Sequence, residues 1–171
     1  MVKSAEEIWQ DALDSRERGD FVSAIDYAKE VVKIEEDNAE AWMAIATWSL
    51  PPPTRGKPSQ PTLQQSAKSI SALRKVVLHE PDNLDAWFMG GRILLDHLGM
   101  LEDAIQWWED CRVHYPEKVT PIIEQIGILV RLGLYEECTD RLAELQNEKM
   151  EEPTNQQSMR LQGVKGMVER A

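Results

Sequence analysis

Apolar residues recur along most of the chain at the three- and four-residue spacing of amphipathic helices, and strand-like alternation is hard to find. This pattern predicts helices over residues 4–18, 21–35, 38–49, 63–80, 84–98, 101–114, 118–132, 135–149 and 155–169. Glycine, Asp-Asn pairs and proline fall at the breaks, where they favour helix ends and caps. Short loops between successive helices predict helical hairpins, so we expect an all-α protein.

An internal repeat is visible in the pattern D-N-x-[ED]-A-W. It occupies residues Asp37 to Trp42 and returns at Asp82 to Trp87. A repeat changes the expected architecture, because one unit cannot bury its apolar face alone and must stack on its neighbours.

The repeat resembles the tetratricopeptide repeat family, a helix-turn-helix unit of about 34 residues. The family pattern has a large residue early in the first helix, a small residue four positions later, Gly at the turn, an aromatic residue two positions after the Gly, Ala three positions further and a closing Pro. One unit fills these positions, in the same order, with Trp87, Gly91, Gly99, Leu101, Ala104 and Pro116, and has one extra residue before Gly99. The first unit matches at Ile8, Ala12, Gly19, Phe21 and Ala24. The second keeps Trp42, Ala46 and Pro81, and the fourth has Ile122, Ile126, Gly133, Tyr135 and Cys138. Asp11 and Gln125 stand where the family usually has Leu, so the end units are expected to pack less well.

The resemblance implies an all-α, right-handed α-solenoid of about four helix-turn-helix repeats. The repeat domain would span residues 1–150, with repeats at about 5–38, 39–83, 84–118 and 119–152. Residues 153–171 would form a C-terminal capping helix that covers the exposed apolar edge of the last repeat. Alternatively, this weakly amphipathic helix detaches from the last repeat and occupies the groove of its own chain.

A proline-rich insertion at 51–62 interrupts the second repeat. Five prolines in twelve residues exclude helix and favour an extended conformation, so we expect an elongated turn. Pro58 to Pro61 also fits the P-x-x-P template for SH3-like domains, and the sequence leaves open whether anything binds it.

The net charge of −11 argues against nucleic-acid and anionic-membrane partners, since both select for Lys and Arg. No run of apolar residues approaches the length of a membrane helix, and the N-terminus lacks the apolar core of a secretory signal. Both cysteines lie inside predicted helices rather than in a disulfide framework. These features predict a cytoplasmic protein.

Candidate chemistry is sparse. His79 and His114 lie near the ends of successive second helices without a carboxylate or thiol partner in evidence, which makes a poor metal site. Cys111 and Cys138 occupy places for small core residues and are expected to be buried free thiols. We find no nucleophile–base constellation, so the sequence predicts no enzyme activity, no metal site and no cofactor.

The first helices of the repeats are apolar on two faces, which requires burial on both faces or a partner. In the family, these helices line a concave groove that holds peptides or partner helices. The second face predicts a partner-binding groove of Trp9, Leu13, Arg16, Met43, Thr47, Leu50, Phe88, Arg92, Leu95, Ile123 and Val130. Some family members clamp a C-terminal carboxylate with Lys and Asn here, and this chain departs from that pattern.

The expected function is non-catalytic binding of a hydrophobic peptide or amphipathic helix from a protein partner. Two structural alternatives are that the groove side chains pack against one another and that the chain fills its own groove. Two functional alternatives are a small acidic tetratricopeptide chaperone that keeps an apolar client soluble, and a homo-oligomeric scaffold.

Overall fold

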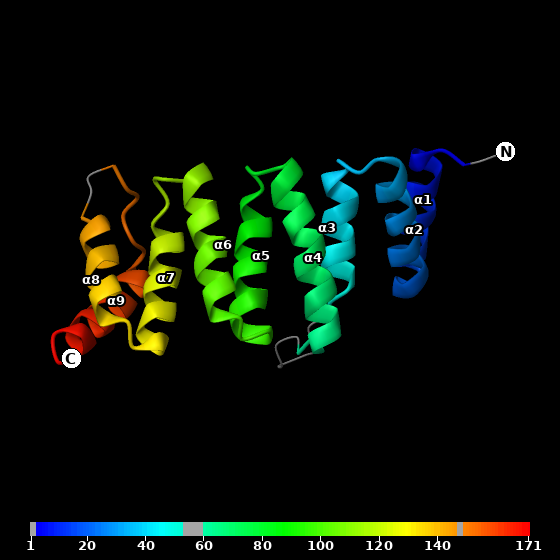
Figure 1. Ribbon diagram of the computed structural model, residues 1–171. Helices are drawn as coiled ribbons and strands as arrows, with labels where there is room; N and C mark the ends of the chain where they lie inside the picture. Colours follow the sequence, from blue (N-terminus) through cyan, green and yellow to red (C-terminus); the bar gives the residue numbers. More distant parts are fainter. Residues whose placement is uncertain (1–2, 53–59, 147–148) are drawn as a thin grey trace. The chain divides into compact units, whose positions relative to one another are not determined.

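The computed structural model describes residues 3–52, 60–146 and 149–171. Their elements are, in order, α1 (Ala5–Glu17), α2 (Phe21–Ile34), α3 (Ala39–Trp48), α4 (Leu63–His79), α5 (Leu84–Arg92), the π-helix η1 (Ile93–His97), α6 (Leu101–His114), α7 (Val119–Leu132), α8 (Tyr135–Glu144) and α9 (Asn155–Val168) (Figure 1). The fold class is therefore the all-α repeat solenoid that the sequence predicted. No helix of these described segments has the length and apolar character needed to cross a bilayer.

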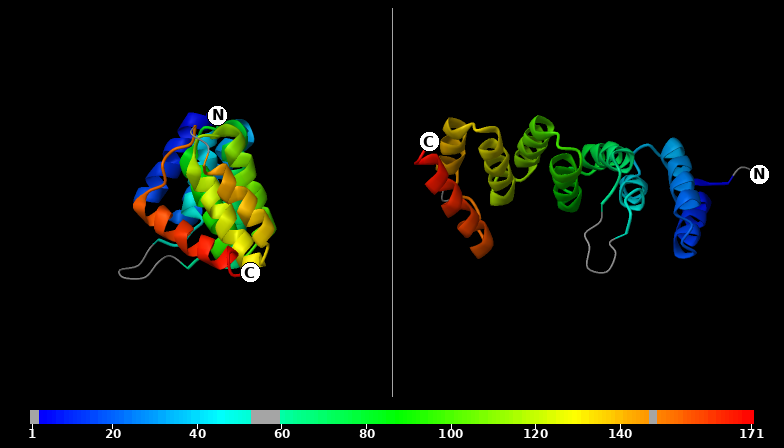
Figure 2. Two further views of the ribbon diagram at one scale, coloured as in Figure 1. Left: turned by 90° about the vertical axis from the view of Figure 1, so that its left-hand side faces the viewer. Right: turned by 90° about the horizontal axis from the view of Figure 1, so that it is seen from below.

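The chain forms two compact units, Met1–Gly99 and Met100–Ala171. In the first unit α1 packs on α2, α2 on α3, and α3 on α4, while α5 and η1 both contact α4. In the second unit α6 packs on α7 and α7 on α8, and α9 lies across these last two helices (Figure 2). The boundary between the units falls between the two helices of the third predicted repeat.

The repeated Asp-Asn motif forms the start of a helix in both of its copies. The Asn38 side-chain oxygen accepts a hydrogen bond from the Ala41 backbone N–H at 2.9 Å, and Asn83 does the same for Ala86 at 3.1 Å. These bonds satisfy one of the N–H groups that every helix start leaves without an intrahelical partner. Ala41 and Ala86 are fully buried, so a larger side chain at either position would have to displace its neighbours.

The tryptophan of the same motif closes the turn from the preceding helix. The Trp42 indole N–H donates to the backbone carbonyl of Glu36 at 2.8 Å, and the Trp87 indole N–H donates to that of Pro81 at 2.9 Å. Each bond spans six residues, so it ties the first turn of one repeat to the last residues of the repeat before it. The motif is thus a junction between repeats.

Within the first and fourth repeats, glycine ends the first helix in the left-handed conformation. Gly19 has a φ of 79° and Gly133 a φ of 73°. Side chains with a Cβ rarely adopt these angles, so both glycines are required where the chain reverses into the second helix.

The extra residue of the third repeat is absorbed by η1. Leu98 donates its N–H to the carbonyl of Ile93 at 3.0 Å, a bond that spans five residues instead of four. A single π-helical turn accommodates one inserted residue without ending the helix. The predicted helix over 84–98 is therefore present as two consecutive elements.

The second repeat carries the insertion between its helices. Thr62 accepts a hydrogen bond from the Gln65 backbone N–H at 3.2 Å, and Gln65 in turn accepts from the Thr62 N–H at 2.8 Å, which forms a capping box at the start of α4. Residues 53–59, which include most of the predicted insertion and the first half of its P-x-x-P segment, lie outside the described residues.

Replacing Asn83 with Ala is expected to lower the free energy of unfolding by about 1 kcal/mol, because the buried end of α5 loses its cap. Asn83→Asp retains a side-chain acceptor, so its loss in free energy of unfolding should be much smaller. Urea denaturation followed by circular dichroism measures both. Equal losses in the two variants would contradict the capping role.

Candidate binding surface

Four predicted groove residues of the first unit meet around one cavity. Met43 on α3, Leu50 just beyond it, and Phe88 and Arg92 on α5 line a hollow of about 730 Å³. Met43, Leu50 and Phe88 are half-buried, so each shows part of its apolar surface to the cavity. Predicted groove residues from two successive repeats thus lie on one surface.

Polar residues line the same cavity as these apolar side chains. Asp85, Asp96 and His97 of α5 and η1 line the same cavity and stand beside the exposed Arg92. These three residues are not among the predicted groove residues, although Asp85 and Arg92 lie seven residues apart on α5 and therefore near one face. The lining of the cavity therefore combines apolar side chains with charges of both signs.

A second hollow of about 390 Å³ adjoins the first. Arg16 and Thr47 line it together with Phe21, Trp48 and the start of the insertion. The Arg16 guanidinium carbon lies 4.9 Å from the centre of the Phe21 ring, a cation–π contact that positions the side chain. Leu50 and Met89 line both hollows, so they form one continuous surface, which we call the apolar groove.

Trp9 packs against its own chain rather than lining either hollow. Its ring stacks on that of Trp48, with centroids 5.9 Å apart and planes inclined by 8°. Leu13, one turn along α1, is half-buried, as is Leu95 in η1. Trp48 is not one of the predicted groove residues, so the ring of Trp9 packs on a side chain outside that set.

In the second unit, α9 covers the predicted groove residues. Ile123 is only 1% exposed and belongs to a core cluster with Leu161 and Val164 of α9, and Val130 packs against the same cluster. Polar contacts strengthen this position of α9, since Arg160 forms an ion pair with Glu124 at 2.7 Å. Ile123 therefore faces no open surface, because its own C-terminal helix shields it from solvent.

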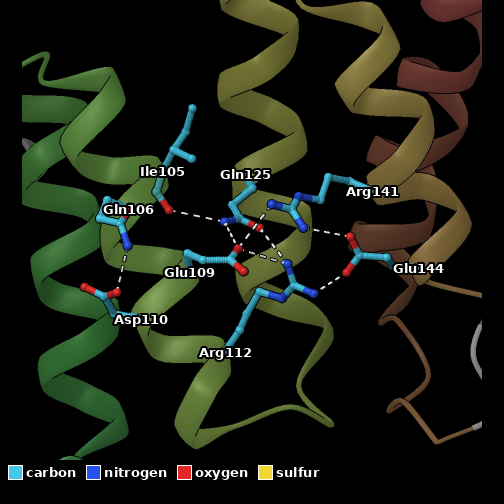
Figure 3. Close-up of polar contacts among 8 residues, drawn as sticks. All are labelled: Ile105, Gln106, Glu109, Asp110, Arg112, Gln125, Arg141 and Glu144. Atoms are coloured by element: carbon cyan, nitrogen blue, oxygen red, sulfur yellow. Dashed lines mark hydrogen bonds and ion pairs between the residues drawn. The ribbon is translucent and has the colours of Figure 1, made fainter.

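A buried glutamine organises the second unit, at a position where the sequence suggested weaker packing. Gln125 is fully buried, and its amide donates to the Ile105 carbonyl at 3.2 Å and to the Glu109 carboxylate at 2.8 Å (Figure 3). These bonds supply partners for a polar side chain that would otherwise be costly to bury. Gln125 consequently joins α7 to α6.

Two arginines extend this network to α8. Arg141 bridges Glu109 at 3.2 Å and Glu144 at 2.7 Å, while Arg112 pairs with the same two carboxylates (Figure 3). Glu109 and Arg112 lie three residues apart on α6, as Arg141 and Glu144 do on α8, so helical spacing was the available signal. The pairs between α6 and α8 could not be predicted from that spacing, because pairing across helices depends on how the helices pack.

The surroundings of Glu109 favour its charged form. Partial burial raises the pKa of this carboxyl, but the hydrogen bond from Gln125 and the charges of Arg112 and Arg141 outweigh it, so the pKa lies below its ordinary value. Both carboxylates of the network are engaged by arginine, which makes it a structural assembly rather than an acid–base site.

The thiols are similarly unsuited to chemistry. Cys111 and Cys138 are fully buried, and burial raises the pKa of the Cys111 thiol to about 12. Burial and the nearby Glu137 also raise the pKa of Cys138. Within the described segments, no group of three or more His, Cys, Asp or Glu side chains is arranged to hold a metal ion.

Glu109→Gln is expected to destabilise the protein at pH 7 and to have little effect in acid. Because the folded-state pKa of Glu109 is lowered, its carboxylate stabilises the fold above the ordinary pKa of about 4.3, and this stability is lost as the pH falls through the lowered value. Urea denaturation between pH 7 and pH 3 measures the difference, with Glu102→Gln, exposed on the same helix, as the control. A difference that stays constant over this pH range would contradict the charged network.

No family model matches the sequence, and no curated protein matches it. Solved structures do. A crystal structure of MamA superposes with a TM-score of 0.57 at 16% identity, covering 82% of this chain and 75% of its own. A second MamA structure, described as MamA AMB-1, superposes with a TM-score of 0.59 at 14% identity, and the match covers 82% of this chain and 70% of that chain. A tetratricopeptide repeat protein from Parabacteroides merdae superposes with a TM-score of 0.61 at 14% identity, and the match covers 95% of this chain and 60% of that protein. Likeness at these identities establishes the fold, and the chain accordingly has the fold of a tetratricopeptide repeat protein.

Proposed function

We propose that the protein is a non-catalytic interaction module whose apolar groove binds a short hydrophobic segment of a protein partner. The observation that carries the proposal is the meeting of Met43, Leu50 and Phe88, all half-buried, around one cavity of about 730 Å³. A half-exposed cluster of this kind gains stability when a partner removes it from water.

The lining suits a peptide better than a rigid, polar ligand. Phe88 offers a large surface with few rotamers, whereas Met43 and Met89 adapt to differently shaped side chains. Arg92, Asp85 and Asp96 in the same lining supply donors and acceptors that would orient the backbone of the bound segment. A volume of this size holds a few side chains.

The partner segment contacts the first unit alone. On α7 the corresponding residue Ile123 is covered by Leu161 and Val164 of α9. A segment that contacts α3, α5 and η1 therefore requires no movement of α9.

Binding through this surface should be lost in the double variant Met43→Ser, Phe88→Ser. Each truncation is expected to cost about 2 kcal/mol of binding free energy, or about thirtyfold in Kd, because both side chains contribute apolar surface to the groove. A quantitative pull-down from native cell extract identifies a bound protein, and titration of that purified protein gives the two affinities. Trp9 is left unchanged, since its stack on Trp48 would confound binding with folding.

The matched control is Val22→Ser, Leu78→Ser, which removes two exposed apolar side chains from α2 and α4 of the same unit. Circular dichroism and urea denaturation establish that all three proteins are folded. If the groove variant retains the same proteins with unchanged affinity, or if the control loses them equally, the proposal fails. Light scattering on wild type and groove variant tests whether a second copy occupies the groove, in which case the wild type would be a dimer and the variant a monomer.

A further inference from the structure

A third and larger cavity lies in the first unit, and none of its described lining residues also lines the apolar groove. It has a volume of about 810 Å³ and is walled by α2 and α4, with α3 between them (Figure 1). We call it the α2–α4 trough. Its described lining is Lys29, Val32, Lys33, Glu36, Trp42, Ile45, Ser49, Gln64, Ala67, Lys68, Ser71, Ala72 and Lys75.

The floor of the trough is apolar and well fixed. Val32, Ile45 and Ala72 are buried, and Trp42 is half-buried with its indole N–H bound to the Glu36 carbonyl at 2.8 Å. The tryptophan ring is thus held in place by the junction between repeats, and one part of it remains open to the trough.

The walls are basic in a protein that is strongly acidic as a whole. Lys29 and Lys33 are four residues apart on α2, and Lys68 and Lys75 seven apart on α4, so each helix turns a row of lysines toward the trough. Among the described lining residues these four lysines face a single acid, Glu36. The net charge of the chain is −11, so this concentration of positive charge is local.

Two of these lysines are available to an incoming anion. Lys29 pairs with Asp26 at 3.0 Å, and Lys75 pairs with Glu36 at 2.9 Å. Lys33 and Lys68 form no ion pair with any residue that the structure describes. They lie on opposite walls, so a ligand in the trough would meet one positive charge from each side.

The dimensions favour an elongated ligand. The lining of α4 extends from Gln64 to Lys75, about 16 Å or three helical turns, and the facing lining runs from Lys29 on α2 to Glu36 in the turn after that helix. An apolar floor between two charged walls is complementary to an amphipathic helix whose apolar stripe is flanked by carboxylates.

We propose that the α2–α4 trough is a second binding site, which takes an acidic amphipathic helix from a protein partner. Apolar side chains of that helix cover Trp42 and Ile45, while its Glu and Asp residues meet Lys33 and Lys68. The site is independent of the apolar groove, so the protein can hold two partner segments at once on the two sides of α3.

The probe is a synthetic, fluorescently labelled peptide of about fourteen residues, long enough as a helix to span about 21 Å. It carries leucine at helical spacing and glutamate on both flanks, and the control peptide replaces every glutamate with lysine. Fluorescence anisotropy with the full chain measures binding, at about 0.05 M and about 0.15 M salt, since exposed charges are screened as salt rises.

Two variants disrupt the site in different ways. Lys33→Glu with Lys68→Glu reverses the charge of the walls, and Ala67→Trp fills the trough from an exposed position on α4 without changing charge. Arg131→Glu with Lys165→Glu, both exposed in the second unit, changes net charge by the same amount as the wall variant. We expect the acidic peptide to bind wild type in a salt-sensitive manner and both trough variants at least about tenfold more weakly.

The control double variant and the groove variant Met43→Ser, Phe88→Ser should bind the peptide as wild type does. Failure of the peptide to bind wild type at about 1 mM, the weak end of specific affinities, would overturn the proposal. An equal loss of affinity in the charge-control variant would show that the peptide responds only to the net charge of the protein. A loss of affinity in the groove variant would show that the peptide binds in the apolar groove. Both results would also overturn it, without affecting the proposed role of the groove.

Discussion

The structure depends first on the turns that connect the last helix of one repeat to the first helix of the next. At two junctions an asparagine caps the new helix, and a tryptophan indole reaches back six residues to a backbone carbonyl. These two bonds fix both the start of the helix and its position against the preceding turn. Because solenoid repeats contact only their neighbours, the geometry of each junction determines which faces remain open.

The third junction uses a different device. Tyr115 and Lys118 keep the backbone hydrogen bonds of the earlier turns, but Lys118 provides no side-chain cap. Instead its ammonium group pairs with Glu151, whose backbone N–H binds the Glu117 carbonyl at 2.8 Å. The segment before α9 therefore secures this turn, and α9 itself covers Ile123. One C-terminal segment both completes the last junction and closes the face of α7.

The two faces of α3 explain why the helix is apolar nearly all round. Trp42 and Ile45 line the α2–α4 trough, whereas Met43 and Thr47 line the apolar groove. Adjacent residues on a helix point about 100° apart, so Trp42 and Met43 serve separate cavities. The charges differ as well, since lysines border the trough and the groove has both signs. A single short helix thus separates two chemically distinct surfaces.

The sequence by itself determined the helices, the turns and the repeat. Periodicity located all the helical segments to within a few residues, except that α8, expected to reach residue 149, ends at Glu144. The glycines at 19 and 133 identified their turns because the left-handed conformation is a local property of the residue. Met43 and Phe88 occupy equivalent positions in successive repeats, and Leu50 follows Met43 by two helical turns, so the pattern indicated that all three share one surface.

Contacts between distant side chains were decided only by the tertiary structure. The stack of Trp9 on Trp48, the burial of Ile123 beneath α9 and the network around Gln125 each depend on how helices pack. The four lysines of the trough also come from two helices separated by the whole of α3. Periodicity tells which face of a helix a residue occupies, but the partner of that face is set by the distances and angles between helices.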